Sequence, residues 1–416
     1  MGKSIGIVGG GIIGLTTAYY LTKAGHKVTI LDKGSMNEGC SFGNAGMIVP
    51  SHFIPLAAPG MIAKGVKWMF NSKSPFYVRP RLSADLLRWG YLFYKSATAE
   101  KVAKAIPALK ELSLFSRSCY QELSKELPFD FGYQERGLMM LYKTEEAEEE
   151  ERETAHLAAK HGIDAHILQP EEIQKLEPDV RVNARGAVFF PGDAHLVPQL
   201  LLYNLKKHLL ELGVNVVTNT EVVDFDLDND LIQSVHTTSG HYSFDEIILA
   251  TGSWSGKVGK KLSLVLPMQA GKGYSFTLEQ VDKNIRIPSI FIEARVAITP
   301  MGNALRFGGT MEIVGVDHTI NMNRVKGIVD SIPSYYPDMK VQLPSKDKVW
   351  HGLRPCTPDG LPYIGRVPNI KNLIVATGHA MLGLSLAPGT GKLVSEILDG
   401  GPKSVECSAF DANRFN

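Results

Sequence analysis

Hydrophobic and polar positions near the N-terminus change their period in a way that predicts a strand, a turn, a helix and a second strand. Residues 4–8 form a short apolar run typical of a buried strand, and residues 15–24 continue with apolar positions at helical spacing. Residues 28–31 form the next apolar run. Strands that alternate with helices in this order predict a parallel sheet and an α/β fold.

Helical spacing and short apolar runs also predict the elements of the rest of the chain. Helical spacing predicts helices over 103–126, 145–162, 196–212 and 391–398. Apolar runs predict strands over 137–142, 186–190, 214–217, 221–225, 244–249, 349–354 and 373–376. A period of two, which indicates an antiparallel sheet, marks the runs 290–293, 295–299 and 304–309.

A chain of 416 residues is long enough for two domains. The α/β pattern stops after the second strand and resumes later, so an insertion interrupts it. We therefore predict an α/β plus α+β fold with two discontinuous parts. A Rossmann-like dinucleotide-binding domain is expected over 1–50, 150–256 and 349–416, and an antiparallel-sheet substrate domain over 51–149 and 257–348.

Composition and charge narrow the class of partner. Hydrophobic residues make up 44% and charged residues 21% of the chain, as in ordinary globular proteins. A formal net charge of +1 gives no reason to expect nucleic acid. The four cysteines are far apart, which argues against a disulfide framework or a metal site. Without a signal sequence or an apolar run of about 18 residues, a cytoplasmic location is expected.

The turn after the first strand carries the first chemical signal. Gly9, Gly11 and Gly14 have the spacing G-x-G-x-x-G between a predicted strand and a predicted helix. In this context the glycines allow a tight turn, close approach of a pyrophosphate and close packing of the helix on the strand. Asp32 ends the second strand and is suited to the ribose hydroxyls of the same ligand. The motif indicates a dinucleotide and does not distinguish FAD from NAD.

Residues 60–95 mix aromatic and basic side chains, which allows two interpretations. Such a mixture suits contact with a membrane surface, where aromatic rings lie at headgroup level and cations face anionic lipid. The commoner use of an aromatic stripe is packing in a core with solvated cations beside it. We keep a peripheral contact with the inner membrane as the alternative interpretation.

Beyond these patterns, the whole chain resembles the FAD-dependent amine and amino-acid oxidoreductases related to D-amino-acid oxidase and glycine oxidase. The likeness is strongest to the bacterial D-amino-acid dehydrogenases, in their small flavin-carrying chain. It is carried, in the family's order, by residues 9–14, 41–46, 57–60, 66–70, 271–275, 312–315, 352–355, 357–360 and 377–383.

The resemblance implies FAD rather than NAD. It implies a non-covalent cofactor, because Gly352 stands where a related branch has a flavin-linked cysteine. The cofactor-binding residues that it implies are Gly9, Gly11, Ile12, Ile13, Gly14, Asp32, Lys33, Ser41, Asn44, Ala45, Gly46, Met47, Val222, Thr251, Gly252, Trp254, Gly378, Gly383, Leu384 and Ser385. The last three are expected near the flavin pyrimidine, where a following helix N-terminus stabilises negative charge.

Four residues are candidates for contact with substrate. Arg354 offers a planar, bidentate clamp for the carboxylate of an amino acid, as in family members with the sequence G-x-R-P, although a salt bridge would also explain it. Tyr274 can supply a hydroxyl group or pack within a sheet. His52 and His379 can lie near the flavin ring or serve a structural role.

The resemblance implies oxidative deamination of D-amino acids in amino-acid catabolism. A hydride would pass from Cα of the neutral amine to flavin N5, giving a 2-oxo acid and ammonia, with electrons delivered to a quinone or a redox protein. Three alternatives stay open: a dehydrogenase of D-proline or hydroxyproline, an oxidase that uses O₂, and a flavoprotein that acts on a partner protein.

Two stretches depart from the pattern of close D-amino-acid dehydrogenases. One is Ser51-His52-Phe53-Ile54, and the other contains His195 in Gly-Asp-Ala-His. Both are expected near the substrate, so the side chain that the enzyme accepts stays open.

Overall fold

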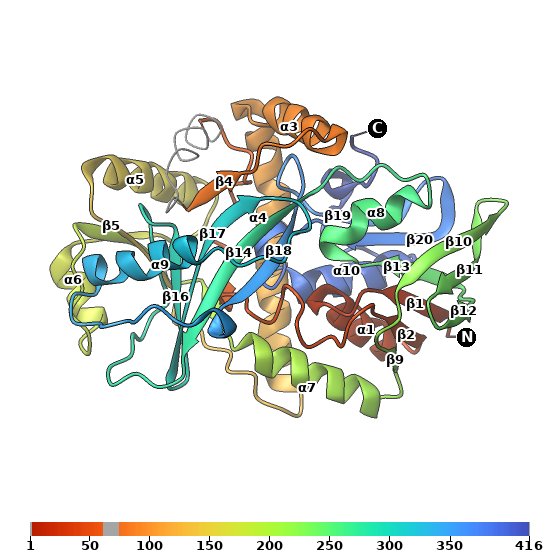
Figure 1. The fold of residues 1–416 in the computed structure, drawn as a ribbon, viewed down its shortest axis with the longest axis horizontal. Coiled ribbons are helices and arrows are strands. Elements are labelled where there is room, and N and C mark those ends of the chain that lie inside the picture. The colour runs from red at the N-terminus through yellow and green to blue at the C-terminus, as the bar shows by residue number, and fades with distance from the viewer. Residues whose placement is uncertain (1, 61–74, 416) are drawn as a thin grey trace.

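The computed structural model describes residues 2–60 and 75–415. Two sheets of different type form two halves of the molecule, with the six-stranded sheet on the right and the nine-stranded sheet on the left in Figure 1. Both chain ends lie at the right-hand side.

The six-stranded sheet confirms the predicted Rossmann-like unit. Its strands follow the order β19-β20-β13-β1-β2-β9. They are β1 (Ser4–Val8), β2 (Lys27–Leu31), β9 (Asn215–Val217), β13 (Glu246–Leu249), β19 (Tyr363–Val367) and β20 (Ile370–Thr377). All neighbouring pairs are parallel except β19 and β20. The sheet therefore joins segments from the beginning, the middle and the end of the chain.

Side chains on the two faces of this sheet enter two different cores, as the period of two requires. Ile5 and Ile7 of β1 face the core that contains helices α1 (Ile12–Lys23), α7 (Pro198–Glu211) and α10 (Ala387–Asp399). The opposite face packs against the small sheet β10-β11-β12 and helix α8. These elements are β10 (Val222–Asp228), β11 (Leu231–Thr237), β12 (Gly240–Tyr242) and α8 (Ser255–Lys260).

Helices α1 and α10 approach each other closely. A Cβ atom at Gly391 would lie 2.7 Å from the backbone of Thr16, so only glycine allows this contact. The Thr16 hydroxyl also donates to the Ala387 carbonyl at 2.9 Å. The predicted closing helix thus begins four residues earlier than its apolar pattern suggested, and Pro388 in its first turn needs no hydrogen-bonded amide there.

The nine-stranded sheet is mostly antiparallel, as predicted. Its order is β18-β14-β17-β16-β15-β5-β7-β6, and β4 pairs with β17. Its strands are β4 (Phe76–Val78), β5 (Leu138–Tyr142), β6 (His166–Leu168), β7 (Gly186–Phe190), β14 (Gln269–Leu278), β15 (Ser289–Phe291), β16 (Val296–Met301), β17 (Ala304–Ile313) and β18 (Trp350–Cys356). Only the β15–β5 and β17–β4 pairs are parallel.

Helices cover the outer parts of this half. Helix α9 (Met322–Tyr335) packs its apolar side on the sheet, and helices α5 (Glu145–Lys160) and α6 (Pro170–Leu176) lie beside β7. Sequence analysis did not predict α6 or α9. The long helix α4 (Ala99–Glu126) packs against α10, and its Ile106 lies in a buried cluster with residues of β5 and β7, so it contacts both halves (Figure 1).

The predicted domain boundaries stay a prediction, and the sheets show how the chain crosses between the halves. Strands β6 and β7 pair into the large sheet, although their residues lie within the predicted range 150–256. Strand β18 also belongs to the large sheet, and the chain then returns to the six-stranded sheet in β19.

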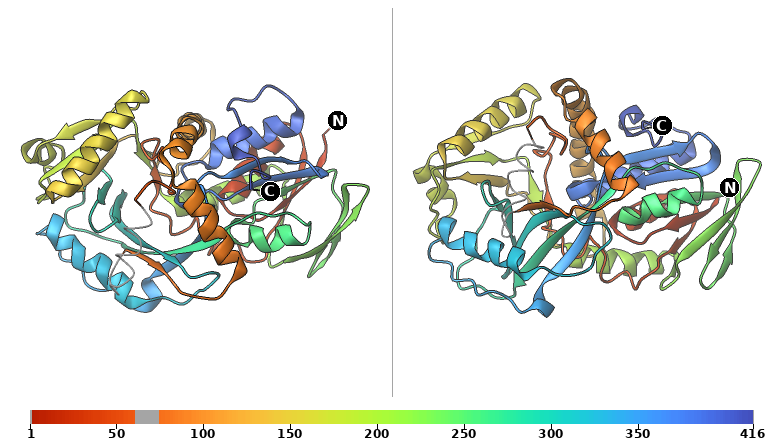
Figure 2. Two further views of the ribbon diagram at one scale, coloured as in Figure 1. Left: turned by 90° about the horizontal axis from the view of Figure 1, so that it is seen from above. Right: turned by 45° about the horizontal axis from the view of Figure 1, so that its top comes forward.

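Helix α3 (Ala84–Ser96) lies on the outside of the molecule, over the join of the two halves (orange in Figure 2). Its inner face packs Trp89 on the end of β18, where the indole N–H donates to the Cys356 carbonyl at 2.9 Å. Within residues 2–60 and 75–415, no helix is long and apolar enough to cross a membrane. Residues 61–74 of the aromatic and basic stretch, with Trp68 and Phe70, lie outside the described residues.

Candidate active site

A cavity of about 1340 Å³ lies where the two halves meet. It is lined by the turn after β1, by the loop over 39–45 and by strands β14, β17 and β18 of the large sheet. A drug-sized ligand typically occupies about 300–1,000 Å³. The cavity therefore has room for an elongated cofactor together with a small substrate.

The glycine turn forms one end of the cavity. Gly9 has a φ of +109°, and a Cβ atom there would lie 2.4 Å from the Ala250 carbonyl oxygen. A Cβ atom on Gly14 would lie 2.0 Å from the Gly9 carbonyl, so this glycine is needed for packing. At Gly11 the nearest atom is Ser41 Oγ at 3.9 Å, and the residue lines the cavity. A side chain at Gly11 would therefore fill ligand space without striking the protein.

The amide groups at the start of α1 complete this end. Ile12 and Ile13 line the cavity in the first turn of a twelve-residue helix, and the Ser41 hydroxyl accepts from the Ile12 amide at 3.3 Å. Free amides and the positive end of a helix dipole favour phosphate groups. The geometry of the turn thus fits the pyrophosphate of a dinucleotide.

Asp32 lies at the end of β2 and lines the cavity. Its carboxylate is oriented by the backbone, because Oδ2 accepts from the Gly10 amide at 2.7 Å and Oδ1 from the Gly34 amide at 2.8 Å. Beside it, the Lys33 ammonium lies 3.4 Å from the centre of the Trp254 ring. Burial lowers the pKa of Lys33, and the acidic groups around it oppose this change.

Side chains of the large sheet bind the backbone of the loop that contains Ser41 and Asn44. Arg306 of β17 donates to the carbonyl oxygens of Phe42 and Asn44 at 3.2 and 2.9 Å, and the Ser275 hydroxyl donates to Gly43 at 2.8 Å. Arg306 is 4% exposed, and burial lowers its pKa to about 10. This arginine was not predicted, because its role depends on a contact between distant segments.

Most predicted cofactor residues meet at this cavity. Those that line it are Gly9, Gly11, Ile12, Ile13, Asp32, Lys33, Ser41, Asn44, Ala45, Met47, Val222, Thr251, Gly252, Trp254, Gly383 and Leu384. The cavity lining does not include the other four, which are Gly14, Gly46, Gly378 and Ser385. Gly46 and Gly378 have φ values of +79° and +82°, and the Ser385 hydroxyl accepts from the Val49 amide. Their predicted role as direct contacts stays a prediction.

Arg354 lies on β18 and lines the cavity from the large sheet. A Cβ atom at Gly273 on the adjacent strand would be 2.2–2.4 Å from the guanidinium group, so a glycine there makes room for it. Its Nη1 donates to the Thr310 carbonyl at 2.6 Å. Within the described part of the chain, no carboxylate lies within ion-pair distance of this group. Burial lowers its pKa, as expected for a cation that has lost water.

Thr310, which sequence analysis missed, has a φ of +68° and lines the cavity. This conformation is unfavourable for a β-branched residue and costs on the order of 1–3 kcal/mol. It directs the Thr310 carbonyl at Arg354. No sequence pattern predicts such a conformation, since Thr310 lies where the register between β14 and β17 shifts.

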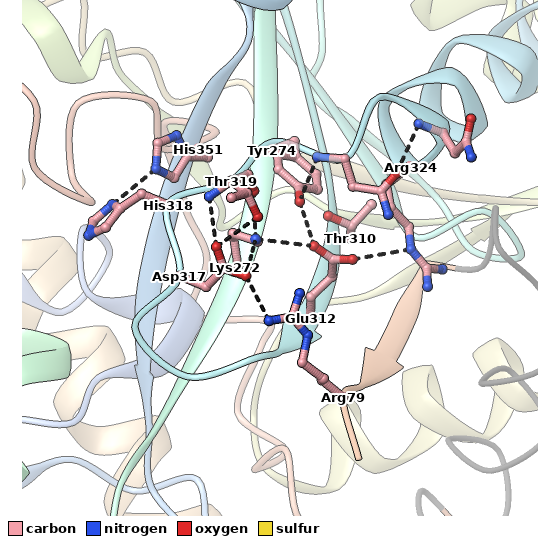
Figure 3. A network of polar contacts seen from close by, with 12 residues as sticks. Arg79, Lys272, Tyr274, Thr310, Glu312, Asp317, His318, Thr319, Arg324 and His351 are labelled. Carbon is pink, nitrogen blue, oxygen red and sulfur yellow. Dashed lines mark hydrogen bonds and ion pairs between the residues drawn. The ribbon is translucent and has the colours of Figure 1, made fainter. Parts of the chain in front are cut away.

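Tyr274 contributes to the cavity wall, but its hydroxyl belongs to a buried polar network (Figure 3). It donates to Glu312 and accepts from the Asn321 amide at 3.2 Å. Burial, together with the bond to Glu312, raises the pKa of Tyr274 above its ordinary value. Glu312 also lies 3.8 Å from Lys272 Nζ and 3.3 Å from Arg324 Nε.

The same network extends toward the cavity mouth. Lys272 is 2% exposed, donates to the Thr319 carbonyl at 2.6 Å and lies 3.7 Å from Asp317. Burial alone would raise the pKa of Asp317, but bonds from Thr319 and the charges of Lys272 and Arg79 lower it to about 2. Next to Asp317, His318 Nδ1 lies 3.1 Å from His351 Nε2 (Figure 3). Each carboxylate of the network is therefore paired with cations of the protein itself.

The two predicted histidines line the cavity in different settings. His379 is buried, and its Nε2 atom pairs with the Thr390 hydroxyl at 3.0 Å. Burial lowers the pKa of His379 to about 3. His52 pairs through Nδ1 with the Ser51 hydroxyl at 3.1 Å, and burial together with Arg295 lowers its pKa to about 4. Both imidazoles are neutral at pH 7.

Comparison with known proteins gives one consistent assignment. The family model described as FAD dependent oxidoreductase matches residues 4–397. A D-amino acid dehydrogenase of Vibrio atlanticus (strain LGP32) is 32% identical over 98% of this chain and 99% of its own. A D-amino acid dehydrogenase of Helicobacter pylori is 31% identical over 99% of both chains.

Solved structures agree on the fold. The glycine oxidase from Geobacillus kaustophilus superimposes with a TM-score of 0.79 and 25% identity, over 100% of this chain and 99% of its own. The L-proline dehydrogenase from P. horikoshii has a TM-score of 0.76 and 20% identity, over 100% of this chain and 98% of its own. The second likeness extends to the fold alone.

The cavity geometry predicts how a side chain at Gly11 affects the cofactor. We expect Gly11→Val to weaken FAD binding by about 10- to 100-fold, because forcing methyl groups into an occupied contact costs about 1–3 kcal/mol. Fluorescence titration of the apoprotein with FAD measures the Kd. The unfolding midpoint of the apoprotein should stay unchanged, since the added Cβ atom meets only Ser41 Oγ at 3.9 Å.

Gly401→Val is the matched control, because nothing lies within 4 Å of its Cβ position. It should leave the Kd for FAD unchanged. Unaltered FAD affinity in Gly11→Val would contradict the assignment of this turn to the cofactor.

Proposed function

This chain belongs to the FAD dependent oxidoreductase family, and on that premise we propose that it oxidises free D-amino acids. The glycine turn, Asp32 and the loop over 39–45 would hold FAD. When bound, FAD supplies the acceptor for the two electrons and the hydrogen that leave the substrate Cα. The resulting imino acid would hydrolyse in water to a 2-oxo acid and ammonia.

The observation that carries the proposal is the setting of Arg354. A half-buried guanidinium group without a carboxylate partner has lost part of its hydration, and a ligand carboxylate would offset that cost. Its planar donors suit a bidentate pair with such a group. Because Arg354 and the glycine turn line one cavity, a carboxylate bound at Arg354 shares an enclosed space with the cofactor site. Orientation of the substrate by this clamp would be the main contribution of the chain.

The D configuration rests on the relatives that are named D-amino acid dehydrogenase and are 31–32% identical over nearly the whole chain. Their name also supports an electron acceptor other than O₂. We propose a quinone or a redox protein in this role.

A peripheral membrane contact through α3 would suit a quinone acceptor. The outer face of α3 exposes Leu87, Tyr91 and Tyr94 at 66%, 56% and 68%. These residues share one helical face, and Arg88 and Lys95 flank them. An exposed apolar stripe with adjacent cations is typical of a surface that binds anionic lipid.

The direct test is anaerobic mixing of the yellow holoprotein with amino acids. We expect D-amino acids to bleach the oxidised-flavin absorbance band and L-amino acids to leave it unchanged. Admission of air should restore the colour slowly compared with a quinone analogue, because the proposed acceptor is not O₂.

Other outcomes of this experiment would replace the proposal. Bleaching by D-proline or hydroxyproline alone would identify a dehydrogenase of cyclic secondary amines. Fast recovery in air would identify an oxidase. No bleaching by any of these compounds, with FAD bound, would favour action on a partner protein.

Arg354→Gln tests the carboxylate clamp. We expect kcat/KM for the D-amino acid to fall on the order of 10²- to 10³-fold, the usual cost of removing one partner of a buried charge pair. Stopped-flow reduction of the flavin measures the effect. The corresponding amine without a carboxylate should react equally in wild type and variant.

Arg181→Gln is the matched control, since that side chain is 63% exposed. Full activity of Arg354→Gln toward the amino acid, with FAD bound, would overturn the assignment.

The α3 surface is tested by sedimentation with vesicles that contain phosphatidylglycerol. We expect the triple variant Leu87→Ser, Tyr91→Ser, Tyr94→Ser to lower the fraction bound by at least about tenfold, from the loss of buried apolar area. The double variant Leu200→Ser, Tyr203→Ser on α7 is the control, because these residues are also exposed. Equal sedimentation of wild type and triple variant would reject the contact.

A further inference from the structure

A hydrogen-bonded chain of three side chains leads from the interior to the cavity. The Ser51 hydroxyl donates to Asp193 Oδ2 at 2.5 Å, and the Ser51 amide donates to Asp193 Oδ1 at 3.1 Å. Ser51 Oγ also pairs with His52 Nδ1 at 3.1 Å. Asp193 is 1% exposed, whereas His52 lines the cavity that holds Arg354.

Pairing of two very short strands creates this chain. Strand β3 (Met47–Ile48) runs antiparallel to β8 (Ala194–His195), with Met47 opposite His195 and Ile48 opposite Ala194. Continuation of this register brings the residues after β3 toward those before β8. Ser51 and Asp193 therefore meet, although 142 positions separate them in the chain.

The hydrogen bonds of Ser51 determine which ring nitrogen of His52 carries the hydrogen. The single hydroxyl hydrogen of Ser51 is used by the Asp193 carboxylate, so Ser51 Oγ accepts the hydrogen of His52 Nδ1. The neutral imidazole then carries no hydrogen on Nε2. Within the described residues, Nε2 has no protein partner, which leaves a proton acceptor for a ligand in the cavity.

We propose that His52, Ser51 and Asp193 form a proton relay that takes one proton from the substrate ammonium group before oxidation. The inference rests on the proposed function, because loss of hydride from Cα requires the nitrogen lone pair of a neutral amine. His52 contacts the substrate. Ser51 and Asp193 act through His52 as positioning residues.

Each bond in the relay is exchanged once. The substrate N–H bond breaks and a bond forms from that hydrogen to His52 Nε2. The Nδ1 hydrogen moves to Ser51 Oγ, and the former Ser51 hydrogen moves to Asp193 Oδ2. The net change is a neutral amine and a protonated Asp193, with His52 neutral in its other tautomer. No oxidant or second reactant is needed.

The electrostatic setting suits this direction of transfer. Burial raises the pKa of Asp193 to about 7, although the bonds from Ser51 and the charge of Arg117 oppose this change. Burial and Arg295 disfavour a charged His52, so a relay that passes the proton onward is favoured over one that stores it on the ring. Arg117 and Arg295 are the charged groups that act on the two ends. Above about pH 7 Asp193 is ionised and able to accept a proton.

The pH dependence of flavin reduction tests the relay. In wild type, kcat/KM should fall as the pH drops through about 7. Asp193→Asn and Ser51→Ala should lower kcat/KM at pH 7.5 on the order of 10²-fold, as for loss of an acid–base group. In both variants kcat/KM should then rise toward the pKa of the free substrate ammonium. At that pH the kcat/KM values of the variants should approach the wild-type value. A structural defect would lower kcat/KM at every pH and would not produce this convergence.

Ser51→Thr retains the hydroxyl group and should restore the wild-type profile. Asp164→Asn is the matched control for the charge change, because Asp164 is 66% exposed. Parallel pH profiles in wild type and Asp193→Asn would overturn the relay.

Binding of 2-aminoisobutyrate gives a readout without turnover, because this amino acid has no Cα–H to transfer. Its Kd, measured from the perturbation of flavin absorbance, should rise below about pH 7 in wild type. In Asp193→Asn that rise should be absent. An identical pH dependence of the Kd in both proteins would contradict proton transfer to Asp193.

The two proposals fail in different ways. If the holoprotein is reduced by another primary or secondary amine and not by D-amino acids, the proposed function is wrong, and the pH profiles are measured with that amine. If D-amino acids reduce the protein and the variants keep the wild-type pH profile, only the relay is wrong.

Discussion

The half-buried Arg354 guanidinium is the constraint on which the arrangement of this site depends. A desolvated cation is costly, and the protein offers it a carbonyl dipole rather than a carboxylate. Three strands form the surroundings of this guanidinium. Strand β18 carries the arginine, Gly273 of β14 leaves space for it, and the Thr310 carbonyl of β17 points toward it. The network of Lys272, Glu312 and Asp317 lies behind the same wall, and each of its carboxylates already has cation partners. Arg354 is thus a cation in the cavity lining that a ligand carboxylate would complete.

The two halves of the molecule offer different groups to a ligand in the cavity. The glycine turn offers backbone amides and the space left by Gly11, which suit a phosphate group of any dinucleotide. The large sheet offers side chains whose positions depend on strand pairing. Arg306 links the two halves, because it leaves β17 and donates to the carbonyl oxygens of the loop beside α1. A change in the large sheet would therefore move the loop beside α1.

Local patterns in the sequence predicted five of the six strands of the six-stranded sheet. The run 4–8 is β1 without change, whereas β19 (Tyr363–Val367) was not predicted. The G-x-G-x-x-G turn needed only neighbouring residues, because its geometry is set by one strand and one helix. The resemblance to a family supplied FAD and Arg354, which no periodicity would have indicated. Helix α9 was missed, although its apolar side lies in the core of the large half.

Contacts between segments that are far apart in the chain could not be predicted from the sequence. Tyr274 was identified as a source of a hydroxyl group, yet Glu312 and the Asn321 amide engage that hydroxyl through strands and loops far along the chain. Ser51 and Asp193 gave no joint signal, because a pair of two-residue strands brings them together. Ser51 and Asp193 lie in the two stretches that were expected to depart from the family pattern, and the structure joins these stretches in one hydrogen-bonded chain. The glycine turn depends on neighbouring residues, whereas the contact of Ser51 with Asp193 depends on strands that pair across 142 positions of the chain, so only the first could be predicted from a local pattern.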